Sequence, residues 1–117
     1  MLRSVAVIGV GLIGGSFARA LKKAGVVERV VGVDRDCDNL QQALALGVID
    51  EAADSLESGV QQAELVFVAV PVRSIARVVA ELAPCLPKGC VVTDGGSVKE
   101  EVVRACEPLM PVGTSFV

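Results

Sequence analysis

Histidine is absent from this 117-residue sequence, and its four cysteines form no C-x-x-C pair. Histidines and closely spaced cysteines are the usual ligands of protein-bound transition metals, so we expect no bound metal. The cysteines are Cys37, Cys85, Cys90 and Cys106, scattered along the chain and flanked mostly by apolar residues. This usage is typical of a reducing compartment and indicates a cytoplasmic protein.

Positive charge and long apolar runs are also scarce. Lys and Arg number 11 against 14 Asp and Glu, which gives a net charge of −3. Domains that bind nucleic acids carry a basic face, so we expect no nucleic-acid partner. No segment reaches the roughly 18 apolar residues of a membrane span, and we expect no membrane partner. The N-terminal residues imitate a signal peptide, but the glycines described below argue against that alternative.

Apolar residues, in contrast, make up 52% of the chain, and the mean hydropathy is +0.60. The strands of a buried parallel sheet are continuous apolar runs, which accounts for this value. The length predicts one domain, large enough to bury roughly two-thirds of its unfolded surface.

A glycine-rich turn near the start of the chain carries the main functional pattern. Val5–Ile8 predicts a buried strand, and Gly9, Gly11 and Gly14 follow it with the spacing G-x-G-x-x-G. In a dinucleotide site the first glycine permits a tight turn, and the second lets the backbone approach a pyrophosphate. The third lets the next helix pack against the sheet.

The helix predicted after this turn, Leu12–Ala24, has apolar residues at Ile13 and Phe17 and ends at Gly25. Free backbone N–H groups and the positive end of the helix dipole lie at the start of such a helix. We therefore expect a diphosphate to bind the three glycines together with Leu12 and Ile13.

An acidic residue stands at the distance that a dinucleotide fold requires. Val30–Val33 predicts a second strand that ends in Asp34, twenty residues beyond Gly14. A carboxylate there accepts hydrogen bonds from the adenosine ribose; the alternative is a solvated turn residue or the N-cap of the next helix. Arg35 can stack on adenine or meet a 2′-phosphate. Because Asp34 would repel that phosphate, we expect NAD rather than NADP.

The rest of the chain alternates helices with strands. In order, we expect a helix capped by Asp36 with Leu40, Ala43 and Leu44 on its inner face, a strand over Val48–Ala52, a polar helix or turn over Ser55–Gln62, a strand over Leu65–Val70, a helix with Ile75, Val78, Val79 and Leu82 on its inner face, a strand over Cys90–Thr93, a helix that Ser97 opens and whose inner face ends at Leu109, and the start of a strand over Thr114–Val117. This alternation predicts an α/β fold: a Rossmann-type, doubly wound parallel sheet in the order 3-2-1-4-5-6, truncated at the sixth strand.

Ligands bind such a sheet at the carboxyl ends of its strands, where the order reverses between strands 1 and 4. We expect Val70, Pro71, Val72 and Asp94 to lie at this edge beside the glycine turn and to contact the cofactor. The alternative for Pro71 is that it only ends a strand and starts a helix.

Three polar side chains near this edge remain ambiguous. Ser97 follows strand 5 and can hydrogen-bond a reacting group, but Ser97 and Glu100 also have the form of a capping box. Arg73 and Arg77 can reach a phosphate or carboxylate, or they form a solvated helix face.

With these motifs assembled, the chain resembles the prephenate/arogenate dehydrogenase family of tyrosine biosynthesis. The resemblance rests on Gly9–Ser16 (G-V-G-L-I-G-G-S), Val33-Asp34, Val70–Val72 and Asp94–Lys99 (D-G-G-S-V-K), and it spans essentially the whole chain. It implies an oxidoreductase that decarboxylates prephenate or arogenate, with hydride transfer to NAD as the ring becomes aromatic. It also implies that Ser97 hydrogen-bonds within the cluster of substrate and cofactor.

The family pattern continues beyond this sequence. In the family, a G-G-H-P segment with the catalytic histidine follows the strand matching Ser115–Val117, and a helical second domain forms a homodimer. Neither is present here. The resemblance thus implies that residues 1–117 are the dinucleotide-binding domain, which alone binds NAD with little turnover.

Two alternatives stay open from the residues alone. One is a non-catalytic, NAD(H)-sensing regulatory domain, which has no need of the D-x-G-S-V-K turn. The other is the cofactor domain of another two-domain dehydrogenase, against which the G-L-I-G-G-S segment argues.

Overall fold

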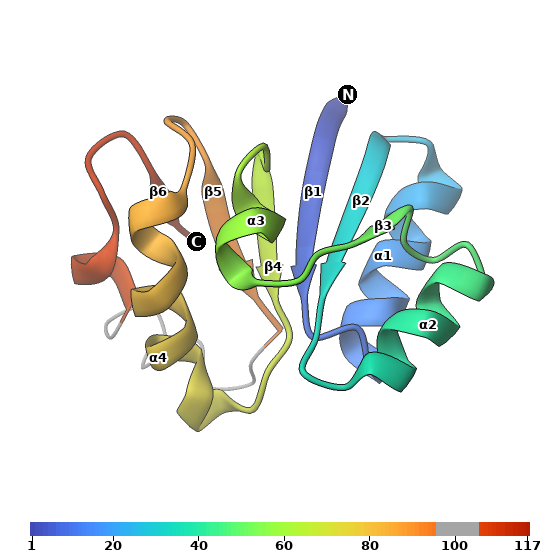
Figure 1. The fold of residues 1–117 in the computed structure, drawn as a ribbon. Helices are drawn as coiled ribbons and strands as arrows, with labels where there is room; N and C mark the ends of the chain where they lie inside the picture. Colours follow the sequence, from blue (N-terminus) through green and yellow to red (C-terminus); the bar gives the residue numbers. More distant parts are fainter. Residues whose placement is uncertain (96–105) are drawn as a thin grey trace.

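A parallel sheet with helices on both faces forms the framework of the protein (Figure 1). The structure is a computed structural model and describes residues 1–95 and 106–117. Its elements are β1 (Leu2–Ile8), α1 (Leu12–Ala24), β2 (Val27–Val33), α2 (Cys37–Ala45), β3 (Glu51–Ala52), α3 (Leu56–Val60), β4 (Leu65–Val68), α4 (Val72–Leu82), the 3-10 turn η1 (Ala83–Cys85), β5 (Val91–Asp94), the 3-10 turn η2 (Glu107–Leu109) and β6 (Ser115–Phe116). Within the described residues the strand order is β3-β2-β1-β4-β5-β6, which confirms the predicted fold.

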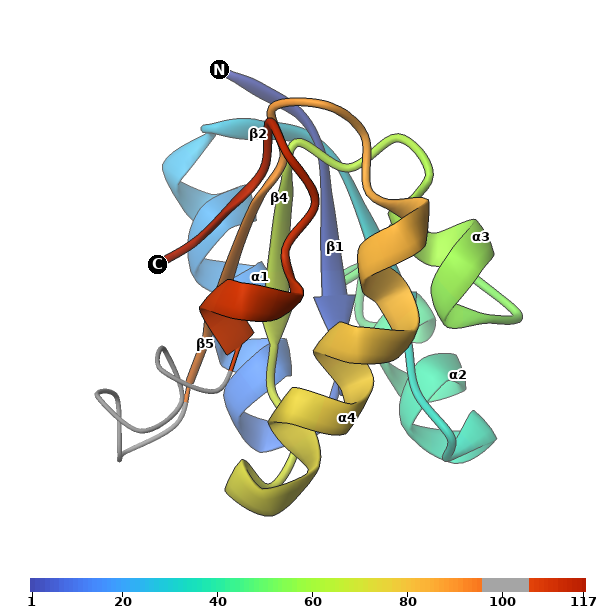
Figure 2. The same ribbon diagram turned by 90° about the vertical axis from the view of Figure 1, so that its left-hand side faces the viewer.

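The central strand β1 contributes alternate side chains to two separate cores. Ala6 and Ile8 belong to a buried cluster with residues of α3 and α4, whereas Val5 and Val7 belong to one with residues of α1 and α2. Successive side chains of a strand point to opposite faces, so one apolar run supplies both cores. Figure 2 shows the resulting layers, with α1 and α4 on opposite sides of the sheet.

The helices pack where their apolar positions predict. Ile75, Val78, Val79 and Leu82 of α4 are all buried. On the other face, Phe17 of α1 stacks on a phenylalanine of β4 with ring centroids 3.9 Å apart. The helix α1 ends as predicted, at a glycine with a φ of 69°, which closes the helix in the left-handed conformation.

Several strand boundaries differ from the prediction. The strands β1 and β2 each begin three residues earlier, because Leu2 pairs with Val27 at the start of the ladder. The strand β3 has only two residues, Glu51–Ala52, because pairing with β2 begins there. Val48 and Ile49, which precede it, are buried in the core without belonging to the strand. At β4 the strand ends at Val68 rather than Val70.

Strand β5 spans Val91–Asp94, one residue later than predicted. The predicted sixth strand forms over Ser115–Phe116 and pairs in parallel with β5. Two apolar positions were wrongly assigned to the interior: Leu44 is 41% exposed on α2, and Leu109 is 38% exposed in the turn η2. The helix predicted to open at Ser97 lies mostly outside the described residues. Among the helices that the structure describes, none combines the length and apolar character of a membrane span.

Candidate nucleotide-binding site

The carboxyl ends of β1 and β4 create an opening, because the segments that follow these two strands leave the sheet toward opposite faces. After β1 the chain enters α1, and after β4 it enters α4 on the other side (Figure 1). Backbone hydrogen bonds hold both exits: Gly9 N–H donates to Val33 O at 2.7 Å, and Ala69 N–H donates to Ile8 O at 2.7 Å. Loops at this edge are thus anchored to the ends of neighbouring strands.

The glycine turn is shaped by close backbone contacts. Gly9 has a φ of 91°, and a Cβ there would lie 2.5 Å from Ala69 O. A Cβ at Gly14 would lie 1.8 Å from Gly9 O, so α1 packs directly on the turn, as predicted for the third glycine. At Gly11, by contrast, a Cβ would have nothing within 4 Å and would point into open space.

The start of α1 is open to an anion. Gly11 is its N-cap and supplies no side-chain hydrogen bond, and the first turn holds no acidic residue. The first N–H groups of a helix lack partners within the helix and carry the positive end of its dipole. Leu12 and Ile13, the first two helical residues, are 87% and 59% exposed. This geometry suits a diphosphate lying across the helix start.

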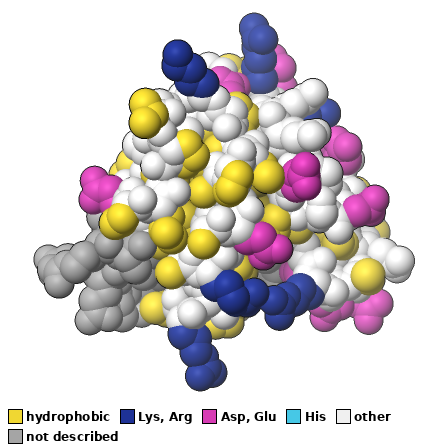
Figure 3. Space-filling model, turned by 60° about the vertical axis from the view of Figure 1, so that its left-hand side comes forward, with side chains coloured by type: hydrophobic (Ala, Val, Ile, Leu, Met, Phe, Trp, Pro, Cys, Tyr) yellow, Lys and Arg dark blue, Asp and Glu magenta, His cyan; other side chains and the backbone are white. Residues whose placement is uncertain are grey.

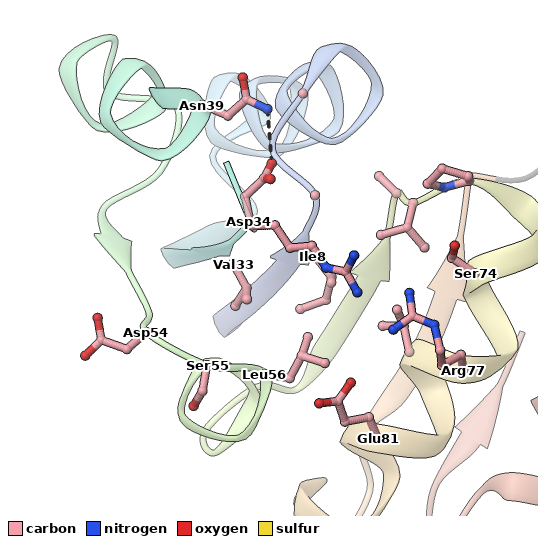
Figure 4. Close-up of a pocket in the computed structure, with 17 residues that line it drawn as sticks. Ile8, Val33, Asp34, Asn39, Asp54, Ser55, Leu56, Ser74, Arg77 and Glu81 are labelled. Atoms are coloured by element: carbon pink, nitrogen blue, oxygen red, sulfur yellow. Dashed lines mark hydrogen bonds between the residues drawn. The ribbon is translucent and has the colours of Figure 1, made fainter. Parts of the chain in front are cut away.

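Asp34 occupies a fixed, half-buried position beside the turn. Its Oδ2 accepts hydrogen bonds from Val10 N–H at 2.9 Å and from Asn39 Nδ2 at 3.3 Å, and its Oδ1 accepts one from Asp36 N–H at 2.9 Å (Figure 4). Asp34 thus lies in the turn but is half-buried and hydrogen-bonded to the glycine turn and to α2 as well as locally. It is not the N-cap of α2, because Asp36 fills that place and accepts hydrogen bonds from the N–H groups of Asp38 and Asn39.

A pocket of about 580 Å³ opens in front of Asp34. Figure 4 shows Asp34 and Asn39 on one side of it, Leu56 of α3 below, and Ser74, Arg77 and Glu81 of α4 opposite. Its remaining lining includes Ile8, Gly9, Gly11, Val33, Arg35, Val70, Pro71 and Val78. An apolar floor with charged groups around it suits a base and a sugar. The carboxyl ends of the strands lie at the bottom of Figure 1, and Figure 3 shows Lys and Arg side chains along this lower edge of the molecule.

Comparison with known proteins identifies the family. A family model described as prephenate dehydrogenase, nucleotide-binding domain, matches residues 17–117. The chain belongs to the prephenate dehydrogenase family. The resemblance drawn from the sequence motifs is therefore confirmed.

Three relatives show how far the similarity extends. The prephenate dehydrogenase of Bacillus subtilis (strain 168) is 39% identical over 100% of this chain and 32% of its own length. The prephenate dehydrogenase of A. aeolicus, solved in complex with hydroxyphenyl propionate and NAD+, superposes with a TM-score of 0.87 at 31% identity, covering 97% of this chain and 40% of its own. The Synechocystis arogenate dehydrogenase superposes with a TM-score of 0.84 at 31% identity, covering 91% of this chain and 37% of its own. The chain thus spans about a third of the curated B. subtilis relative.

In this member of the family, some of the predicted site residues line the pocket and others lie outside it. Gly9, Gly11, Asp34, Arg35, Val70 and Pro71 line the pocket, together with Arg77, whose role was ambiguous from the sequence. Leu12, Ile13, Gly14, Val72 and Asp94 do not line it. The end of β5 instead meets the start of α1, since a Cβ at Gly95 would lie 3.1 Å from Ile13 Cγ2. Ser97 lies outside the described residues.

Sequence reasoning missed part of the pocket. Asn39, Leu56, Ser74 and Glu81 line it but belong to no nucleotide motif. Of these four, Asn39 had a partial sequence signal: its position three residues after the helix cap Asp36 places it on the first turn of α2 but does not specify its contact with Asp34.

Proposed function

We propose that this chain is the NAD-binding domain of a prephenate or arogenate dehydrogenase. The observation that carries the proposal is the arrangement of Asp34. Its carboxylate is held at the mouth of an adenosine-sized pocket, one hydrogen bond from the glycine turn. A carboxylate in this place binds ribose hydroxyls and repels a 2′-phosphate, which favours NAD over NADP.

The cofactor lies across the carboxyl edge of the sheet in this proposal. The diphosphate binds Gly9, Gly11, Leu12, Ile13 and Gly14, the adenosine ribose binds Asp34, adenine packs against Arg35, and the nicotinamide half lies toward Val70, Pro71, Val72 and Asp94. Ser97 hydrogen-bonds within the cluster of substrate and cofactor. Bound NAD+ supplies the hydride acceptor; the chain's own residues bind and orient it.

The proposed reaction is the oxidative decarboxylation of prephenate or arogenate in tyrosine biosynthesis. This sequence contains no histidine, so the histidine that the family resemblance implies would come from outside residues 1–117. We propose that these residues form the dinucleotide-binding domain of a cytoplasmic homodimer.

Calorimetric titration of the chain with NAD+ and NADP+ tests the cofactor assignment. We expect NAD+ to bind at least about tenfold more tightly, because the 2′-phosphate meets the Asp34 carboxylate. The variant Asp34→Asn removes that charge and should bring the two affinities close together. Asp54→Asn, which makes the same charge change elsewhere on the pocket wall, is the control. Absence of NAD+ binding by the wild-type chain would refute the proposal.

The substrate assignment is tested by offering prephenate and arogenate with NAD+ and following NADH. We expect little or no NADH from this chain alone and turnover when it is fused to the remainder of a family member such as the B. subtilis protein. The ratio of the two rates would then identify the substrate. Failure of a fusion that still binds NAD+ would refute the assigned reaction while leaving cofactor binding intact.

A further inference from the structure

The hydrogen bonds around Asp34 leave one direction for a ligand. A carboxylate offers roughly four lone-pair positions, two on each oxygen. Within the described residues, Oδ2 accepts from Val10 N–H and Asn39 Nδ2, whereas Oδ1 accepts only from Asp36 N–H. Oδ1 is therefore the oxygen with capacity left for a ribose hydroxyl.

Asn39 helps to hold the carboxylate in this orientation. The last side-chain torsion of an aspartate is broad, and its two ionised oxygens are equivalent, so what has to be fixed is the torsion angle of the group. The Asn39 amide donates a second hydrogen bond to the oxygen that already accepts one from Val10 N–H, which narrows the range of that torsion and keeps the other oxygen, Oδ1, beside Asp36 N–H with capacity left for a ligand. Its Nδ2 must face the carboxylate, because an ionised carboxylate has no proton to donate to the amide oxygen.

The position of Asn39 is itself fixed by the start of α2. Asp36 caps this helix and accepts a hydrogen bond from Asn39 N–H at 3.4 Å, which holds the Asn39 backbone on the first turn. The side chain is partly buried and reaches Asp34 across the β2–α2 corner (Figure 4). Hydrogen bonds thus connect the helix cap Asp36 to the Asn39 backbone, and the Asn39 amide to the Asp34 carboxylate, which lines the pocket.

We propose that Asn39 is a positioning residue of the cofactor site, which orients Asp34 so that Oδ1 faces the adenosine ribose and thereby sets the affinity for NAD+. This inference rests on the proposed role of Asp34 in binding ribose. Asn39 acts through Asp34, so its contribution depends on the presence of ribose hydroxyls on the ligand.

The test compares two ligands across four proteins. The ligands are NAD+ and an NAD+ analogue that lacks both hydroxyls of the adenosine ribose; the proteins are wild type, Asn39→Ala, Asn39→Asp and the control Gln41→Ala. Gln41 is exposed on the same helix and does not line the pocket. Affinities are measured by calorimetry, and thermal melts confirm that each variant is folded.

We expect Asn39→Ala to weaken NAD+ binding by about tenfold, the effect of losing one hydrogen bond to a charged group, and to change binding of the analogue by less than about twofold. Asn39→Asp should weaken NAD+ binding further, since it replaces the donor with a second carboxylate of the same shape beside Asp34. Gln41→Ala should bind both ligands like the wild type.

Two results would overturn the inference. One is that Asn39→Ala binds NAD+ within twofold of the wild type. The other is that it loses the same factor for both ligands, which would show a general structural effect. A different result would count against the proposed function itself: a wild-type chain that binds NAD+ and the analogue equally would remove Asp34 from ribose binding, and with it the role of Asn39.

Discussion

Two glycines of the turn, Gly14 and Gly11, should respond in different ways when each is replaced by alanine. A Cβ at Gly14 would lie 1.8 Å from Gly9 O, 3.0 Å from Gly9 C and 3.1 Å from Val7 Cγ1. Both nearest atoms are backbone atoms of the turn, which cannot move aside as a flexible side chain can. Gly14→Ala therefore requires α1 or the turn to shift by about 1 Å in a close-packed region.

The adjacent Gly15 provides a matched control. A Cβ there would lie 3.6 Å from Val10 O, an ordinary contact distance. Replacing glycine by alanine in a helix stabilises it by about 0.5–1 kcal/mol, and this gain applies to both positions. Forcing a group into a packed site costs about 1–3 kcal/mol, and here the cost lies at the upper end because backbone must move. We expect Gly14→Ala to be destabilised by about 2 kcal/mol and Gly15→Ala to be slightly stabilised.

Replacing Gly11 should change the affinity for NAD+ without changing the stability of the fold. The φ of Gly11, −74°, lies outside the left-handed region that favours glycine, and a Cβ would meet nothing within 4 Å. Gly11→Ala should therefore fold as well as the wild type, yet its methyl group would occupy the space through which the backbone approaches a diphosphate. We expect its affinity for NAD+ to fall by at least about tenfold.

Urea unfolding and thermal melts followed by circular dichroism measure the stabilities, and calorimetry measures NAD+ binding. For a chain of this size the gap between Gly14→Ala and Gly15→Ala corresponds to about 10 °C in melting temperature. If Gly14→Ala and Gly15→Ala melt within about 2 °C of each other, the packing argument is wrong. If Gly11→Ala binds NAD+ like the wild type, the diphosphate does not cross this turn.

Three further predictions concern single side chains. Asp36→Ala removes the cap of α2 and should lower the free energy of unfolding by about 1 kcal/mol, measured in urea; an unchanged midpoint would show that the cap contributes nothing. Burial alone would raise the pKa of Asp50, but hydrogen bonds from Lys22 and Val30 N–H and the nearby positive charges outweigh it and hold that pKa below its usual value of 3.8. The stabilisation is present above that value and is lost as the pH falls through the folded-state pKa, so Asp50→Asn should flatten the acid limb of a pH–stability curve, and identical limbs would contradict this. Burial raises the pKa of the Cys90 thiol to about 11, whereas Cys37 is exposed; iodoacetamide at about pH 8 should label Cys37 in the native protein and Cys90 only after unfolding, as peptide mass spectrometry would show.

Much of the fold follows from local patterns. Helix α1 has the predicted bounds, because apolar spacing and a terminal glycine are encoded within the segment. Strand ends were less predictable. Whether Leu2 or Val48 belongs to a strand depends on the partner it meets across the sheet, and that partner is distant in sequence. Leu44 and Leu109 show the same limit for burial, since an apolar side chain stays exposed where no other element covers it.

The sequence by itself indicated the family and the strand order, and it predicted the two parts of the proposed dinucleotide site, the glycine turn and Asp34. These are encoded by residue type and by short spacings, which constrain backbone geometry directly. Only the tertiary structure decided what faces them. The pairing of β1 with β4 brings α3 and α4 opposite Asp34, so that Leu56 and Arg77 complete the pocket. The fold also places Asn39 within 3.3 Å of the Asp34 carboxylate, a contact that depends on how α2 leaves the sheet and that no spacing rule specifies.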